Sequence, residues 1–278
     1  MKEVTIVKAL KSTVIIVTIL MLTLLSFQST TSAENSKSNK LTKIKVPDSV
    51  LDITKENTYP NPTQDLPYLQ PSDLAKTLLE TTDVPIQNPD LIRILNESSI
   101  NTTPTAVGFR ATIYLGQWPL SYESIETNIN WEYKPVNTNK FDNRGGNAPQ
   151  KIHYLQETET VIKGGLTSRI NNAEEVQKMM MLTAMKKTEL PLAFETVIGQ
   201  GTKKDQVYNI SPKKLGYLYA FAPAVNEKGK VTFGEVYLEF KGSKAKLNIK
   251  NVTQQGIGAW IPVQDHLSFK FVTSGTPK

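Results

Sequence analysis

One stretch of alternating residues, from Lys214 to Phe240, constrains the fold of this 278-residue chain more than any other feature. Its first half has apolar or aromatic side chains at every second position, namely Leu215, Tyr217, Tyr219 and Phe221, and its second half repeats the pattern at Val236, Leu238 and Phe240. A period of two is typical of a β-strand with one buried face. Between the halves, Asn226-Glu227-Lys228-Gly229 has asparagine and glycine at the first and fourth positions of a type I turn. The stretch therefore predicts a β-hairpin with its turn at residues 226–229.

Alternating runs predict further strands along the chain. They cover residues 109–115, 128–133, 152–163, 192–198, 206–210, 245–254 and 266–272. Trp118-Pro119 is expected to end the first of them, and residues 134–150 are expected to form a long loop. Because strands follow strands instead of alternating with helices, the sequence predicts a mainly β protein with a few helices. The expected architecture is an antiparallel β-sandwich-like domain with three short α-helices.

Three segments have the signals of helices. Ser72 can cap a helix over residues 73–81, and Asn88 followed by Pro89 is a cap and first-turn signature for residues 90–96. A third helix, capped by Asn171 or Asn172, is expected to run to Lys187. Methionines surround much of its circumference, so this helix is either covered on several sides or offers a methionine-rich surface to a partner.

The amino terminus has the pattern of an export signal. Three lysines precede an uncharged apolar run from Val14 to Phe27, which is followed by Thr31-Ser32-Ala33. The apolar run is shorter than the roughly 20 residues of a membrane-spanning helix, so cleavage after Ala33 is favoured over an uncleaved anchor. The expected organisation is a signal peptide (1–33), a flexible tether (34–45) and a single mainly-β domain (46–278) with a proline-rich wrapping segment (59–71). The protein is then secreted or associated with the cell envelope.

Composition excludes several kinds of site. The chain contains no cysteine, which rules out disulfides and thiolate metal sites, and only two histidines, which rules out a histidine-rich metal site. No motif predicts a cofactor or a metal, and no set of residues forms a recognisable catalytic constellation. Stability must therefore come from packing.

The charge is unevenly distributed along a chain whose net charge is +6. Residues 201–250 contain ten basic and four acidic side chains, whereas residues 51–100 contain three basic and eight acidic ones. The acidic segment can lie across the basic sheet, or the basic face can meet an anionic polymer. The lysines that carry this prediction are Lys241, Lys244, Lys246 and Lys250. They predict contact with an anionic wall polymer or a membrane surface, not with nucleic acid, and the alternative is a solubilising edge strand.

A polar stretch from Gln254 to His266 is the second candidate site, because Asp265 and His266 are adjacent and follow Trp260. Trp260 could stack on a sugar, although an interior tryptophan is the usual case in a sandwich. Consecutive side chains on a strand point to opposite faces, so Asp265 is poorly placed to orient His266. With Arg144 from the expected long loop, Trp260 and His266 are therefore candidate binding residues, and no catalytic residue is assigned.

Four strings give the chain a family resemblance. They are residues 56–62 (ENTYPNP), 142–146 (DNRGG), 222–229 (APAVNEKG) and 259–266 (AWIPVQDH). With these strings the chain resembles the YfkD-like family of exported proteins from Gram-positive spore-forming bacteria, over nearly all of the region after the export signal. The resemblance implies an export route and brings no site residues with it.

Three functional hypotheses follow. The first is a non-catalytic binding or structural protein of the cell envelope that contacts an anionic polymer, a membrane surface or a protein partner. The second is a hydrolase of cell-wall glycan or ester that uses the region around His266. The third is a protein-interaction module that uses the methionine-rich helix.

Overall fold

The computed structural model describes residues 44–53, 58–59, 70–98 and 108–277. Residues 43–278 form one compact unit. Its described part is mainly antiparallel β-sheet with three helices, in open sheets consistent with a sandwich-like domain, so the predicted class is confirmed. The expected signal peptide and nearly all of the expected tether and proline-rich segment lie outside the described residues. None of the described helices is long and apolar enough to cross a membrane.

The strands and helices follow one another in this order: β1 (Val50–Asp52), β2 (Thr58–Tyr59), α2 (Asp73–Leu79), α3 (Pro89–Glu97), β3 (Arg110–Asp142), β4 (Gln150–Leu155), β5 (Thr160–Lys163), β6 (Gly165–Leu166), α4 (Ala173–Thr188), β7 (Glu195–Ile198), β8 (Lys203–Ile210), β9 (Leu215–Lys241), β10 (Lys244–Pro262) and β11 (His266–Ser274). The main sheet has the order β1-β11-β9-β10-β6, with β3 on the other side of β9. β2, β7 and β5 form a second sheet, and β4 pairs with β8.

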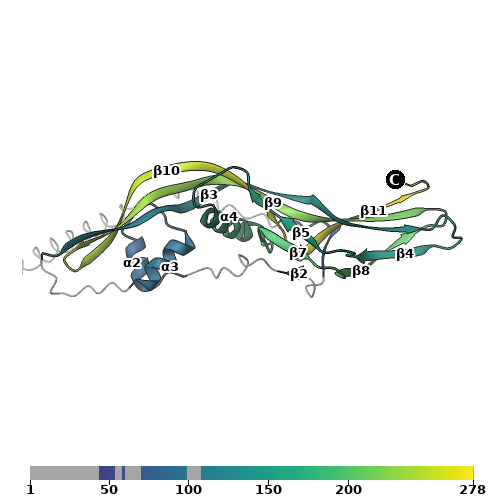
Figure 1. The fold of residues 1–278 in the computed structure, drawn as a ribbon, viewed down its shortest axis with the longest axis horizontal. Helices are drawn as coiled ribbons and strands as arrows, with labels where there is room; N and C mark the ends of the chain where they lie inside the picture. The colour runs from purple at the N-terminus through teal and green to yellow at the C-terminus, as the bar shows by residue number, and fades with distance from the viewer. Residues whose placement is uncertain (1–43, 54–57, 60–69, 99–107, 278) are drawn as a thin grey trace, which may run out of the picture. The chain divides into compact units, whose positions relative to one another are not determined.

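The predicted hairpin is wrong, because residues 215–241 form the single strand β9 (Figure 1). β9 pairs with β3 on one side, and with β11 and then β10 on the other. The expected turn lies in the middle of this strand, where Val225 and Val231 are fully buried in a core beneath α4. At about 3.3 Å per residue, the strand measures on the order of 90 Å along its length.

Gly229 is needed in this strand for close packing against β3, and not for a turn. It is not among the glycines with positive φ. A Cβ atom at this position would lie 2.2 Å from the Glu123 carbonyl oxygen and 2.5 Å from the Tyr122 hydroxyl. Only glycine leaves room for this close approach of β3.

The length of β3 shows that two predictions made from the sequence are wrong. Trp118-Pro119 does not end the strand, and residues 134–142 of the expected long loop continue it. Register shifts occur next to Pro119 and Pro135, so bulges accommodate two residues that cannot donate a ladder hydrogen bond. Of the expected loop, only the turn between β3 and β4 is left. Asn143 stabilises it, because its buried side chain donates to the carbonyl oxygens of Ala148, Ile210 and Ser211.

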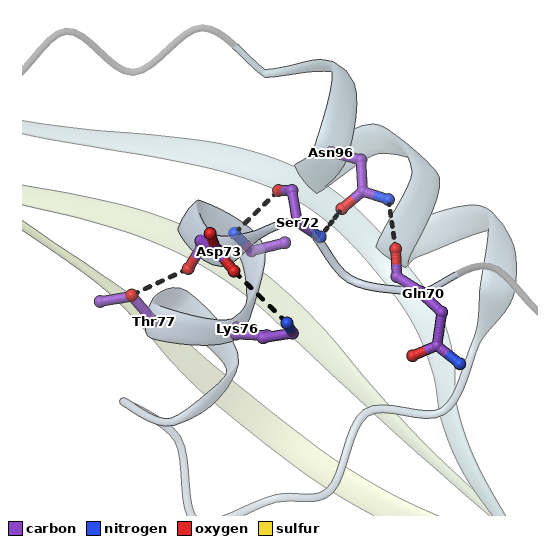
Figure 2. Close-up of polar contacts among 7 residues, drawn as sticks. Gln70, Ser72, Asp73, Lys76, Thr77 and Asn96 are labelled. Atoms are coloured by element: carbon purple, nitrogen blue, oxygen red, sulfur yellow. Dashed lines mark hydrogen bonds and ion pairs between the residues drawn. The ribbon is translucent and has the colours of Figure 1, made fainter.

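Helices α2 and α3 confirm the predictions made from their caps. Asn88 accepts hydrogen bonds from the amides of Asp90 and Leu91, and Ser72 accepts one from the amide of Ala75. Asn96 of α3 accepts from the Ser72 amide at 2.7 Å and donates to the Gln70 carbonyl at 3.1 Å, which ties the two helices together (Figure 2). Their buried leucines pack on one face of β3, β9 and β10, around Leu120, Leu238 and Leu247.

Helix α4 lies where the sequence predicts it, but Asn172 has a left-handed backbone and makes no side-chain capping bond. Met179, Met180 and Met181 are at most 2% exposed and pack against β9 and β10. These methionines are core residues, so they do not provide the exposed surface that the interaction-module hypothesis requires.

Candidate functional site: a row of cations at the end of the main sheet

Three basic side chains lie in register across the end of the main sheet where β3 begins and β9 turns into β10. Arg110 is directly opposite Lys241, and Lys241 is directly opposite Lys244. Residues opposite one another in antiparallel strands project from the same face, so the three cations form one row. All three residues are exposed. We call Arg110, Lys241 and Lys244 the cation row.

In the next row along the same face, the positive charge of Lys246 is compensated by the negative charge of Glu239. Glu239 forms an ion pair with Lys246 at 3.2 Å and accepts a hydrogen bond from Asn248 at 2.5 Å. The hydrogen bonds from Asn248 and Lys246 lower the pKa of Glu239, so it is ionised at neutral pH. Lys246 is therefore neutralised locally. Among the described residues, no acid forms an ion pair with a member of the cation row.

A cavity of about 670 Å³ adjoins the cation row. Its lining combines all three members of the row with the Glu239–Lys246 ion pair, with Thr81, which follows α2, and with Phe240 and Ala245 from the apolar face. The cavity therefore offers positive charge beside an apolar wall, a combination that suits an anionic group attached to an apolar or ring-shaped moiety.

Lys250 has a different environment from the other predicted lysines. Its ammonium nitrogen lies 4.6 Å from the centroid of the Tyr237 ring, a cation–π contact. Tyr237 in turn donates a hydrogen bond to Glu235 at 2.8 Å. Lys250 is thus engaged within the sheet, and only Lys241 and Lys244 of the four predicted lysines belong to the cation row.

Helices α2 and α3 of the acidic segment do lie across the sheet, but they pack on β9 and β10 through apolar side chains, and in the described residues their acids pair elsewhere. Asp73 and Asp90 form ion pairs with Lys76, Arg93 and Lys178, and Asp52 pairs with His266. Among the described residues, none of these pairs reaches a lysine of residues 201–250.

The acid that contacts His266 is Asp52 and not the adjacent Asp265. Its Nε2 atom lies 2.9 Å from the Asp52 carboxylate on β1, and its Nδ1 atom lies 2.8 Å from the Gln264 carbonyl oxygen. Both ring nitrogens are engaged, so neither is left to take a proton from a nucleophile. The pair joins β1 to β11, where Asp52 and His266 are in register.

The other predicted binding residues lie far from the row. Trp260 belongs to β10, not to a loop, is opposite Asn226 of β9 and stacks on Tyr133 with 5.1 Å between ring centroids. Arg144 follows the end of β3 that faces Leu215, at the opposite end of β9 from Lys241. It forms an ion pair with Asp142 at 2.7 Å, and hydrogen bonds from Arg144 lower the pKa of Asp142 to about 2. The seven predicted binding residues do not converge on one cleft.

Sequence reasoning did not identify a buried carboxylate, Glu227, which is completely inaccessible to solvent in the middle of β9. It accepts hydrogen bonds from the hydroxyls of Tyr122 at 2.9 Å, Thr127 at 2.6 Å and Ser124. Lys187 at the end of α4 donates to Ser124 at 2.6 Å. Burial, followed by the nearby Glu227 charge, raises the pKa of Tyr122, so its hydroxyl remains a donor. The network joins β3, β9 and α4.

Arg110 was also missed as a site residue. The alternation of residues 109–115 was evident, but the sequence does not show that Arg110 faces Lys241 across two strands. Within the described residues, no group of three acidic, histidine or cysteine side chains is arranged to bind a metal.

Comparison with known proteins gives the family. The model of the YfkD-like protein family matches residues 47–278. A protein of Bacillus subtilis (strain 168), "Uncharacterized protein YfkD", is 64% identical over 236 residues, which cover 85% of this chain and 89% of that protein. No solved structure matches. On the family match and this identity, the chain belongs to the YfkD-like family.

Proposed function

We propose that this chain is an exported, non-catalytic protein of the cell envelope that holds a phosphate-bearing anionic ligand on its cation row. The observation that supports this proposal is the alignment of Arg110, Lys241 and Lys244 without an acidic partner among the described residues. Like charges directly opposite one another on a sheet are destabilising. An anionic ligand would remove that repulsion. The cation of the next row, Lys246, differs because Glu239 already compensates its charge.

The geometry of the row favours a ligand with more than one anionic group. Adjacent strands lie roughly 4.8 Å apart, so a row across three strands presents its charges over about 10 Å. Arginine can bind a phosphate in a bidentate manner, and lysine binds it as a point charge. A chain or surface with closely spaced phosphates can therefore contact all three side chains, while a single small anion reaches one or two.

Removing the three charges is expected to weaken binding to inorganic polyphosphate more than tenfold, because each lost cation removes about 1 kcal/mol of attraction to a phosphate-rich ligand. The variant is Arg110→Gln, Lys241→Gln, Lys244→Gln in residues 34–278, which contain the whole compact unit. Affinity would be measured by titration calorimetry at two salt concentrations. The wild-type affinity should fall as salt rises, because counterions screen the contacts.

The matched control is Arg169→Gln, Lys151→Gln, Lys203→Gln, which also removes one arginine and two lysines. All three control residues are exposed, and no ion pair joins them to another described residue. This control should bind polyphosphate nearly as well as the wild type. Equal weakening by both triple variants would mean that net charge alone drives binding, and that result would overturn the proposed site.

A further inference from the structure

Two tyrosines lie on the same face of the main sheet as the cation row. Arg110 and Tyr114 are four residues apart in β3, Lys241 and Tyr237 are four residues apart in β9, and the register does not shift between them. Side chains at every second position of a strand project from one face, so both tyrosines share the face of the cations. Tyr114 is directly opposite Tyr237, with 5.0 Å between their ring centroids. We call Tyr114 and Tyr237 the tyrosine pair.

The surface between the cations and the tyrosine pair is exposed. Tyr114 is 55% exposed, and Thr112, which lies between Tyr114 and Arg110 on this face, is exposed as well. Helices α2 and α3 pack around Leu238, which follows Tyr237 in β9 and therefore projects from the opposite face. The cation row thus has an accessible aromatic neighbour on one continuous surface.

The position of the Tyr114 ring is restrained by its neighbours. The hydroxyl of Tyr237 donates a hydrogen bond to Glu235 at 2.8 Å, and the Lys250 ammonium nitrogen lies 4.6 Å from the centroid of the Tyr237 ring. Two polar partners therefore fix Tyr237, which in turn contacts the ring of Tyr114. An aromatic ring that is restrained in this way loses little conformational entropy when a ligand stacks on it.

The row between the cations and the tyrosine pair decides which ligand fits. It consists of Thr112, Glu239 and Lys246, and the ion pair between the last two leaves it without net charge. An unbroken chain of phosphates lying along this face would bring a phosphate against the Glu239 carboxylate, and like charges repel. A sugar ring instead offers hydroxyl groups to Glu239 and Thr112, and its C–H face can stack on Tyr114. The surface therefore favours a ligand in which phosphates alternate with sugar rings.

We infer that the cation row and the tyrosine pair together bind a glycan whose sugar rings are joined by phosphodiesters. Its phosphates contact Arg110, Lys241 and Lys244, and a sugar ring stacks on Tyr114, about 13 Å away along the strand. This inference rests on the proposed function, since it names the class of polymer that supplies the phosphates. Inorganic polyphosphate has the phosphates without a ring, so the two contacts can be tested separately.

The Tyr114→Ala variant of residues 34–278 tests the inference, with poly(N-acetylglucosamine 1-phosphate) as the probe. The substitution should lower the affinity for this glycan about fivefold, which corresponds to about 1 kcal/mol, the scale of one aromatic stacking contact. It should keep wild-type affinity for inorganic polyphosphate, which has no ring to stack. Tyr114→Trp should retain glycan binding, because it keeps an aromatic face. Titration calorimetry would measure both affinities, and thermal melting would verify that each variant is folded.

Phe109→Ala is the matched control. Phe109 is 52% exposed at the same end of the sheet, but its ring lies 6.3 Å from that of Phe240, which packs against the core beneath α2 and α3 on the opposite face. Its substitution should leave the affinities for both polymers unchanged.

Four results would overturn the inference and leave the proposed function standing. They are unchanged glycan affinity in Tyr114→Ala, an equal loss of affinity for both polymers in that variant, an equal loss of glycan affinity in Phe109→Ala, and wild-type binding to polyphosphate alone. Stronger binding to phosphatidylglycerol vesicles than to the glycan, at equal phosphate concentration, would assign this face to a lipid surface and would also overturn the inference. If the wild type binds neither polymer, the proposed function fails as well.

Discussion

Replacing Glu227 by alanine is expected to lower the free energy of unfolding by about 3–5 kcal/mol, the largest single effect anticipated in this protein. The carboxylate is fully buried, and three hydroxyl groups donate to it. Alanine would leave the hydroxyls of Tyr122 and Thr127 without their acceptor and would open a cavity between β3 and β9. Lys187 would also lose the carboxylate that it reaches through Ser124. Glu227→Gln should cost less, because it keeps the volume and one acceptor oxygen.

Urea unfolding followed by circular dichroism would measure this effect. Glu126→Ala is the control, since Glu126 is a glutamate on the adjacent strand whose ion pair with Lys228, at 2.9 Å, is about half exposed. An exposed pair of this kind contributes little to stability, because water screens the two charges. A Glu227→Ala variant that is no less stable than Glu126→Ala would show that the buried hydroxyl network does not hold these strands together.

Replacing Leu120 by alanine is expected to destabilise the protein by about 2–5 kcal/mol. Leu120 is completely buried in β3 and lies in the core that attaches α2 and α3 to the sheet. Its carbonyl oxygen accepts hydrogen bonds from the amides of Gln87 and Asn88, which lead into α3. The substitution should therefore loosen both helices as well as lower the unfolding midpoint.

Leu155→Ala is the corresponding control, because Leu155 lies on β4 with 42% of its surface exposed. Its substitution should change the free energy of unfolding by no more than about 0.5–1 kcal/mol. Hydrogen exchange should show faster exchange of the α2 and α3 amides in Leu120→Ala than in Leu155→Ala. Equal unfolding midpoints for the two variants would contradict the position of Leu120 beneath the helices.

The local signals in the sequence were sufficient for the two short helices. Asn88 and Ser72 cap helices because their side-chain oxygens reach amides two or three residues away, and that geometry depends on neighbouring residues alone. The alternation around Leu215 and Leu238 was likewise sufficient to predict strands and a mainly β fold. These features could be inferred because one residue spacing determines each of them.

The long strands could not be predicted in this way, because their continuity depends on residues far away in the chain. Asn226 and Gly229 favour a turn locally, but α4 covers Val225 and Val231, and two neighbouring strands pair with residues 224–230. Tertiary packing outweighs the local preference for a turn. The cation row required the same information, because the register of β3 and β10 on β9 decides which basic side chains meet.

The continuity of β9 is the claim on which the rest depends, since it places the cation row at one end of the sheet and Arg144 at the other. The chain has no cysteine, so Lys214→Cys with Lys241→Cys allows two fluorescent labels to be placed on exposed positions. A continuous strand separates them by on the order of 90 Å, whereas a hairpin with its turn at residues 226–229 would place them opposite one another. Arg110→Cys with Lys241→Cys, whose positions are in register, is the positive control. We predict energy transfer close to zero for the first pair and strong transfer for the second, and strong transfer between positions 214 and 241 would contradict the account.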